Sequence, residues 1–147
     1  MSGSAGAVSC LKKQDALVKL FEECASIEMR YEKIIEMGRA LPAYPKEFES
    51  QENLVEGCQS VMHLHSWIQE GKIHFLARSE ALISAGLAAL LIFVYSDEPP
   101  EALLTCPPRF LAQLNIPASL SPSRSNGLAS LHRKMQSDAL KFLSLIH

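Results

Sequence analysis

Apolar residues at steps of three and four predict two helices in the first third of the chain. The first covers residues 15–25, where one face carries Leu17, Val18, Leu20 and Phe21. The second begins after Ser26, because serine is a favoured N-cap residue and Glu28 complements the helix dipole in the first turn. Its apolar stripe consists of Ile27, Tyr31, Ile34, Ile35 and Gly38. Pro42 cannot continue a helix, so residues 43–52 are predicted to be a polar connector.

After Cys58 the hydrophobic pattern changes to a period of two, which is typical of β-strands. Residues 61–69 and 73–77 are predicted to form two strands joined by a tight turn at Glu70 and Gly71. With Ile68 opposite Ile73, one face carries Met62, Leu64, Ile68, Ile73, Phe75 and Ala77, and the other carries Val61, His63, His65, Trp67, His74 and Leu76. The first face is predicted to lie on the core because it has no ionisable group. We also allow for a short third strand at residues 54–55.

Helical patterns dominate the second half of the chain. The most apolar of them covers residues 80–95, with Ser79 as a favoured N-cap residue. Its apolar run is far shorter than the ~20 residues that a membrane span requires, so we expect a buried helix. Short helices are predicted after the proline pairs at 99–100 and 107–108, and a loop over residues 115–123. The last helix carries a stripe of Leu128, Leu131, Met135, Ala139, Phe142 and Ile146.

The elements together predict a fold of the α/β class in its α+β form, a small antiparallel sheet packed against helices. A length of 147 residues suits one domain, which we place at residues 14–147. Residues 1–13 are predicted to be a disordered tail, because the first nine are small and nearly uncharged.

Composition and charge exclude several classes of function. Lys and Arg total 14 against 16 Asp and Glu, so the net charge of −2 offers no basic surface for nucleic acid. Aromatic residues make up 7% of the chain, too few for a platform that stacks single-stranded bases. The sequence shows neither a membrane span nor an apolar signal-peptide segment, so we expect a cytoplasmic protein without membrane contacts.

The four cysteines, at positions 10, 24, 58 and 106, contain no Cys-x-x-Cys pair. This spacing matches neither a zinc knuckle nor a thioredoxin-like redox pair, and without a secretion signal we expect reduced thiols. Cys58 differs from the others because Gly57 precedes it and Gln59 and Ser60 follow, whereas buried cysteines usually have apolar neighbours. These surroundings are compatible with a functional thiol and with a half-buried cysteine at the end of a strand.

Histidines near Cys58 suggest two further kinds of site. A peptidase-like Cys–His pair would use His63 or His65, but their faces of the strand are unfavourable for contact and no oxyanion loop is recognisable. A metal site would use His63, His65 and His74, which share one face of the hairpin. Half-exposed histidines on a solvated sheet face are the more common arrangement, so we expect no metal site.

Several sequence blocks form a pattern that runs from Leu17 to the last helix. They are Tyr-Glu-Lys-Ile-Ile-Glu-Met-Gly (31–38), Leu-Pro (41–42), Asn-x-Val-x-Gly-Cys-Gln-Ser (53–60), Gly-Leu-Ala-Ala (86–89) and Leu-Ser-Pro-Ser-Arg-Ser-Asn-Gly-Leu (120–128). Together they resemble the SufE family of sulfur acceptor proteins. The specific part is the Gly-Cys-Gln-Ser block followed by a Ser-Arg-x-x-Gly-Leu block.

The resemblance implies a function. SufE-like proteins accept sulfane sulfur from a SufS-type cysteine desulfurase, stimulate that enzyme and deliver the sulfur to an iron–sulfur scaffold complex. Cys58 would be the acceptor, with Gly57, Gln59, Ser60 and Arg124 as supporting or partner-binding residues. The chain would carry no cofactor and no metal and would have no independent turnover, since the pyridoxal phosphate belongs to the partner desulfurase. The family fold, which IscU and NifU scaffold domains share, is an antiparallel sheet with helices around it.

Alternatives remain beside this interpretation of the blocks. A cluster-binding or metal-binding scaffold of the same fold would need three neighbouring ligands, and only Cys58 is well placed. An acceptor for a desulfurase of another pathway, as in CsdE-like relatives, would carry the same Gly-Cys-Gln-Ser block. An unrelated helical interaction domain would leave Cys58 inert, and Arg124 would then be a solvated or carboxylate-paired residue at the start of the last helix.

Overall fold

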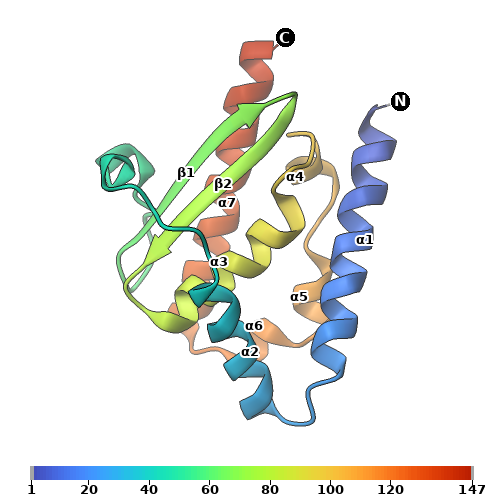
Figure 1. Cartoon of the computed structure of the whole chain (residues 1–147), viewed down its shortest axis with the longest axis vertical. Coiled ribbons are helices and arrows are strands. Elements are labelled where there is room, and N and C mark those ends of the chain that lie inside the picture. Colours follow the sequence, from blue (N-terminus) through green and yellow to red (C-terminus); the bar gives the residue numbers. More distant parts are fainter. Residues whose placement is uncertain (1, 147) are drawn as a thin grey trace.

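Figure 1 shows the computed structural model of the chain, which describes residues 2–146 and the side chains of residues 8–145. In chain order the elements are α1 (Ser2–Glu22), α2 (Ile27–Arg39), two 3-10 turns (Lys46–Phe48 and Gln51–Asn53), β1 (Met62–Gln69), β2 (Lys72–Ser79), α3 (Leu82–Tyr95), α4 (Ala102–Thr105), α5 (Arg109–Gln113), α6 (Ile116–Ser119) and α7 (Pro122–Ile146). The strands form one two-stranded antiparallel sheet packed against helices, which confirms the predicted fold class.

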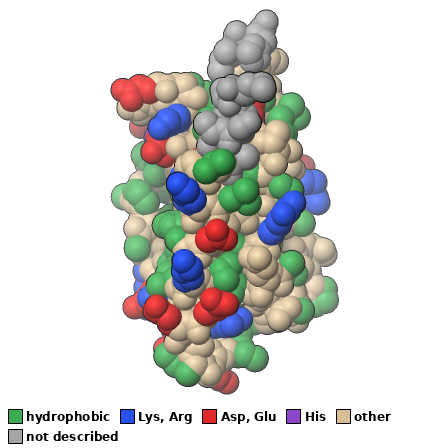
Figure 2. Space-filling model, turned by 90° about the vertical axis from the view of Figure 1, so that its right-hand side faces the viewer, with side chains coloured by type: hydrophobic (Ala, Val, Ile, Leu, Met, Phe, Trp, Pro, Cys, Tyr) green, Lys and Arg blue, Asp and Glu red, His purple; other side chains and the backbone are tan. Residues whose placement is uncertain are grey.

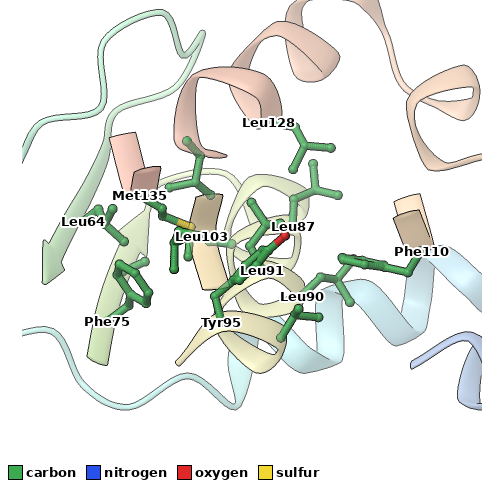
Figure 3. Packing of buried hydrophobic residues seen from close by; sticks show 14 of the residues in the cluster. Leu64, Phe75, Leu87, Leu90, Leu91, Tyr95, Leu103, Phe110, Leu128 and Met135 are labelled. Carbon is green, nitrogen blue, oxygen red and sulfur yellow. The ribbon is translucent and has the colours of Figure 1, made fainter. Parts of the chain in front are cut away.

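Helix α3 lies at the centre of the molecule and packs against α1, α2, α7 and β2 (Figure 1). Its side chains Leu87, Leu90 and Leu91 are buried, as predicted for this apolar helix. Figure 3 shows them in one cluster with Phe75 from the hairpin and Met135 from α7. Burying each such side chain contributes roughly 1.5–3 kcal/mol, so this shared core holds the hairpin and the helices together.

The hairpin has the predicted register, with Ile68 paired to Ile73. Glu70 and Gly71 both have positive φ values, of 54° and 76°, which suits a two-residue turn that follows the twist of the strands. The buried residues of the core face are Met62, Leu64, Ile73, Phe75 and Ala77. The histidines lie on the other face, as predicted, whereas Ile68, the core-face residue of β1 nearest the turn, is only partly buried.

Two serines were predicted to be N-cap residues, and the structure confirms one of them. The N-cap at Ser26 is confirmed, since its Oγ accepts a hydrogen bond from the Met29 N–H group. The N-cap predicted at Ser79 is wrong, because β2 continues through Ser79 and α3 begins only at Leu82. Ser79 instead pairs with Met62 at the end of the ladder.

Two connecting segments also differ from the prediction. Leu54 forms a single β-bridge with His63, and the Val55 N–H group donates to the Met62 carbonyl at 2.9 Å. The short third strand is therefore reduced to one bridge beside β1. The loop predicted over residues 115–123 contains the short helix α6, since prolines are tolerated in a first helical turn.

Helix α1 begins much earlier than the pattern predicts. Its buried stripe consists of Cys10, Gln14, Leu17 and Phe21. The disordered tail predicted for residues 1–13 is therefore wrong for the described residues, while Met1 lies outside them. The apolar pattern failed here because the first half of the stripe is made of a cysteine and a glutamine instead of aliphatic side chains.

Long-range contacts hold this first half of α1 in place. Cys10 forms a disulfide bond with Cys106, at a sequence separation of 96, and both residues are buried. The expectation of reduced thiols is therefore wrong for this pair. The Gln14 amide nitrogen donates to the Pro107 carbonyl at 2.9 Å, and its oxygen accepts from the Phe110 N–H group at 3.0 Å. The glutamine is thus paired on both ends, which makes its burial tolerable.

Helices α2 and α3 approach each other so closely that the crossing requires glycine. A Cβ atom on Gly38 would lie 2.6 Å from the Gly86 nitrogen, and a Cβ on Gly86 would lie 2.5 Å from Cγ2 of Ile34. Neither distance is compatible with an ordinary contact, so any side chain would push the two helices apart. The crossing fixes the first two turns of α3 in space.

Charges of both signs are mixed on the side of the molecule that α1 forms. Figure 2 shows Lys and Arg side chains interspersed with Asp and Glu on this face, with apolar side chains between them. One ion pair anchors the helix from inside, since Lys13 Nζ lies 2.6 Å from a carboxylate oxygen of the buried Glu98. No described helix combines the length and the apolar character that crossing a membrane would take.

Candidate functional site

The candidate thiol lies on the loop between the turn Gln51–Asn53 and β1. In this loop Gly57 has a φ of +89°, a left-handed conformation that residues with side chains rarely adopt. A Cβ atom at Gly57 would also lie 2.5 Å from the Ser130 Oγ on α7. Glycine at this position lets the loop pass close to α7 and brings Cys58 against the start of that helix.

The Cys58 side chain is partly buried and packs against the core. Its Sγ donates a weak hydrogen bond to the Gly127 carbonyl at 3.7 Å. A Cβ atom on Gly127 would lie 3.4 Å from this sulfur, an ordinary van der Waals distance, so the sulfur lies directly beside the backbone of α7. A cavity of about 10 Å³ adjoins the thiol, roughly the space that one water molecule requires. The sulfur atom therefore lies in a confined space at the edge of the core.

The guanidinium group of Arg124 reaches the same place from α7. Its Nη1 donates hydrogen bonds to Ser60 Oγ at 3.1 Å and to Ser84 Oγ at 2.8 Å. Ser60 follows Cys58 in the loop, and Ser84 belongs to the first turn of α3, so the site joins three separate parts of the chain. Among the described side chains, no carboxylate oxygen lies within 4.0 Å of this guanidinium.

Burial and the nearby arginine act on the Cys58 thiol in opposite directions. Burial raises the pKa of the Cys58 thiol because desolvation penalises the thiolate, and the positive charge of Arg124 lowers it. Burial is the larger influence, so the pKa lies above its ordinary value. At neutral pH the protein alone therefore holds this cysteine mainly as the protonated thiol.

The structure brings the predicted site residues together. Cys58, Gln59 and Arg124 line one small cavity, and Ser60 joins the site by accepting a hydrogen bond from Arg124. Gly57 shapes the loop that carries the thiol. Arg124 is partly buried and held by two hydroxyl groups, so it is neither simply solvated nor paired with a described carboxylate. The roles of these residues in sulfur transfer stay predictions.

Sequence reasoning missed two residues of this site. Ser84 lies in an otherwise apolar stretch of α3, and the signal for it is a small polar residue at a buried helix position. Gly127 belongs to the same sequence block as Arg124, and the signal for it is a glycine inside a helix, where glycine usually has a packing reason.

The other two candidate sites near the hairpin do not form. The Cys58 thiol has no histidine as a hydrogen-bond partner within the part of the chain that is described. His65 stacks instead between Phe48 and Trp67, with ring centroids 3.7 Å and 5.4 Å away. Across the described residues, no three His, Cys, Asp or Glu side chains are grouped so that they could hold a metal ion. Stacking on the outer face of the hairpin thus accounts for His65.

The fold and the site define a class of protein: a small α+β domain in which the loop before β1 carries a free thiol, Cys58, with an arginine beside it. Residues 15–139 match the family model described as "SufE: Fe-S metabolism associated domain". The chain belongs to the SufE family, which confirms the resemblance seen in its sequence blocks.

Known proteins of this kind cover most of the chain. SufE-like protein 1, chloroplastic/mitochondrial, of Arabidopsis thaliana is 35% identical over 129 residues, which are 87% of this chain and 35% of the plant protein. This chain therefore spans about a third of that relative's length. An uncharacterised SufE-like protein of Synechocystis sp. is 29% identical over 126 residues, or 86% of this chain and 79% of that protein.

A solved structure shares the whole architecture. The solution structure of a hypothetical protein from Thermus thermophilus matches with a TM-score of 0.75 and 25% sequence identity. The match covers 90% of this chain and 96% of the other. The arrangement of hairpin and helices is therefore an established fold.

Proposed function

We propose that Cys58 accepts sulfane sulfur from a SufS-type cysteine desulfurase, stimulates that enzyme by unloading it, and carries the sulfur to an iron–sulfur scaffold complex. The observation that carries this proposal is the position of Cys58: a free thiol on a loop, next to the guanidinium of Arg124, in a SufE-family chain. The description of the family model, which refers to iron–sulfur metabolism, supports the destination of the sulfur.

The transfer is a thiol–persulfide exchange. The Cys58 thiol loses its proton, and the thiolate attacks the terminal sulfur of a cysteine persulfide on the desulfurase. A sulfur–sulfur bond forms at Cys58 while the bond to the enzyme's cysteine breaks, and the electron pair of the broken bond leaves with that cysteine as a thiolate. Sulfur moves at an unchanged oxidation level, so no external oxidant or reductant takes part.

The distribution of the cysteines suits a carrier. Cys10 and Cys106 are joined to each other in the core, so neither is available to attack a persulfide on Cys58. The other free thiol, Cys24, lies between α1 and α2 and lines a different pocket from Cys58. No described thiol therefore lies at the cavity of Cys58 to discharge a persulfide as an intramolecular disulfide. The raised pKa of the free Cys58 thiol fits a carrier that reacts when a partner engages the loop and not with thiol reagents at large.

The proposal assigns no cofactor to this chain. The pyridoxal phosphate belongs to the desulfurase, and this protein acts as carrier and activator without turnover of its own. A cytoplasmic location is part of the proposal, although the plant relative bears the name chloroplastic/mitochondrial.

Intact mass spectrometry tests the acceptor directly. After incubation with a cysteine desulfurase and cysteine, the natural chain is expected to gain the mass of one sulfur atom and to lose it again with a thiol reductant. Incubation without cysteine is the control. Absence of the gain, with a desulfurase that releases sulfide normally, contradicts the proposal.

The CsdE-like alternative uses the same thiol and differs only in the partner. Parallel titrations with a SufS-type desulfurase and with the desulfurase that CsdE-like proteins serve separate the two functions, because the true partner is expected to bind and load this protein at lower concentration. Equal, weak loading by both favours neither and places the chain outside both pathways.

A further inference from the structure

Ser84 is an unusual residue for its surroundings. It belongs to α3, whose other buried side chains are aliphatic apart from Tyr95, and it is itself buried. A buried hydroxyl is costly unless it is hydrogen-bonded. The partner of Ser84 is Arg124 Nη1, which donates to its Oγ at 2.8 Å, a normal distance for a charge-assisted hydrogen bond.

The two hydroxyl groups that hold Arg124 are uncharged. A carboxylate in their place would neutralise the guanidinium, and the described side chains offer none within 4.0 Å. Ser60 and Ser84 therefore restrict the long arginine side chain without cancelling its positive charge. Ser60 lies on the same loop as Cys58, whereas Ser84 is fixed in the first turn of α3.

We propose that Ser84 is a positioning residue for the sulfur site: it holds the guanidinium of Arg124 at the cavity beside Cys58, where the positive charge faces the sulfur anion. For the thiolate of Cys58 the proposal rests on the hydrogen bond of Ser84 and on the cavity that Arg124 and Cys58 share. For the persulfide anion it rests on the proposed function. The cavity of about 10 Å³ that these three residues line is roughly the size that one water molecule requires, so the guanidinium and the sulfur share one confined space.

The rigidity of α3 explains why Ser84 matters more than Ser60. The loop that carries Ser60 also carries Cys58, so a movement of the loop displaces both together. Ser84 stays with the core, because the glycine crossing of α2 and α3 fixes this end of the helix. Ser84 therefore ties the arginine to the core, whereas Ser60 ties it to the loop. The charge of Arg124 lowers the pKa of Cys58 against the larger effect of burial, which is consistent with this arrangement.

The test measures the thiolate of Cys58 without any partner. The rate of alkylation by iodoacetamide is followed as a function of pH, and peptide mass spectrometry separates Cys58 from the other free thiol, Cys24. Ser84→Ala is expected to raise the apparent pKa and to slow alkylation below it by roughly threefold, since the rate follows the thiolate fraction. An unchanged pH profile in a folded Ser84→Ala protein overturns the proposal.

A matched pair of variants separates the hydroxyl group from packing. Threonine and valine have nearly the same shape, but only threonine has an oxygen that can accept the hydrogen bond. Ser84→Thr is expected to keep the natural pH profile, and Ser84→Val to behave like Ser84→Ala. If both variants shift the profile equally, Ser84 acts through packing and the proposal fails.

A double-mutant cycle shows whether Ser84 acts through Arg124. In an Arg124→Met background, Ser84→Ala is expected to leave the alkylation profile unchanged, because the charge to be positioned is gone. A further slowing in that background contradicts a positioning role.

Sulfur loading by the desulfurase then tests whether Ser84 also affects the transfer of sulfur to Cys58. Loading of Ser84→Ala is expected to slow by about the same threefold as its alkylation at the same pH. Failure of the natural chain to load contradicts the proposed function, whereas the alkylation profiles still decide the role of Ser84. Normal loading of Ser84→Ala, despite a shifted alkylation profile, would mean that Ser84 does not assist Cys58 in the complex with the desulfurase, and it overturns the role of Ser84 in sulfur transfer.

Discussion

Burial makes the Cys58 thiol a source of pH-dependent stability. Its pKa is higher in the folded protein than in the unfolded chain, so the folded state keeps the proton to higher pH. The resulting stabilisation is fully present below the unfolded value of about 8.5 and is lost as the pH rises through the folded pKa. Urea unfolding at about pH 7 and about pH 9.5 is expected to show a loss of stability that Cys58→Ala reduces. The same loss in both proteins would show that other groups are responsible.

Replacement of the acceptor separates chemistry from binding. Cys58→Ser is expected to abolish sulfur uptake, because a serine hydroxyl is not ionised at neutral pH and cannot attack a persulfide as a thiolate does. The fold should change in stability by no more than about 1 kcal/mol, since the residue is only partly buried in a loop. Mass spectrometry and titration calorimetry with the desulfurase check the two expectations. Sulfur on the serine variant would place the acceptor elsewhere, and loss of both uptake and binding would make Cys58 an interface anchor.

The sequence singled out Cys58 as the candidate acceptor and named Arg124 and Ser60 as supporting residues, but it did not reveal Ser84. The Gly-Cys-Gln-Ser block lies within one loop, so local sequence is enough to single out Cys58. The contact between Ser84 and Arg124 spans 40 residues and joins two helices, and no local pattern encodes such a crossing. A small polar residue in an apolar helix was the available hint.

Among the structural elements, the disulfide between α1 and the segment after α4 has the largest expected effect on stability. A cross-link at a sequence separation of 96 removes loop entropy from the unfolded chain, which a chain-entropy model values at about 4–5 kcal/mol. Cys10→Ala with Cys106→Ala is therefore expected to lower the urea midpoint strongly and to leave sulfur acceptance at Cys58 intact. Cys24→Ser is the matched control, with a change within about 1 kcal/mol because Cys24 is only partly buried. A variant that combines these three replacements, at Cys10, Cys24 and Cys106, should still accept sulfur. If it folds but no longer does so, Cys58 is not the only acceptor.

The glycine crossing of α2 and α3 gives a second prediction at this scale. Gly38→Ala is expected to destabilise the fold by about 1–3 kcal/mol, because the new methyl group would overlap the backbone at Gly86. Gly71→Asn is the control: it has open space around it, and asparagine tolerates the positive φ of the turn. Thermal unfolding of both variants measures the difference. Equal stabilities would mean that the helices separate without cost.

Periodicity predicted the elements that have a regular apolar face and failed where tertiary contacts decide. The hairpin register followed from alternation on both sides of Gly71. The first half of α1 was missed because Cys10 and Gln14 become core residues only through partners near Cys106. The start of α3 was placed too early because Ser79 pairs with Met62 of β1 and so extends β2.

On the scale of the whole molecule, the sulfur site depends on the complete fold. Its hydrogen bonds join residues that are 40, 64 and 69 positions apart, from the loop, α3 and α7. Both helices also carry the core, since Leu87 and Leu128 lie in the same cluster (Figure 3). The arginine therefore reaches the thiol only when the central helix and the last helix have packed together.

The buried Cys10–Cys106 disulfide differs in accessibility from a sulfur atom carried on Cys58. Both of its residues have at most 1% of their surface exposed, whereas Cys58 lies on a loop at the surface of the core. A loaded chain would therefore hold two sulfur–sulfur bonds of very different accessibility. A dilute phosphine is therefore expected to remove the outer sulfur from Cys58 before it reduces the buried Cys10–Cys106 bond, so the loaded sulfur could be released while the structural bond stays closed.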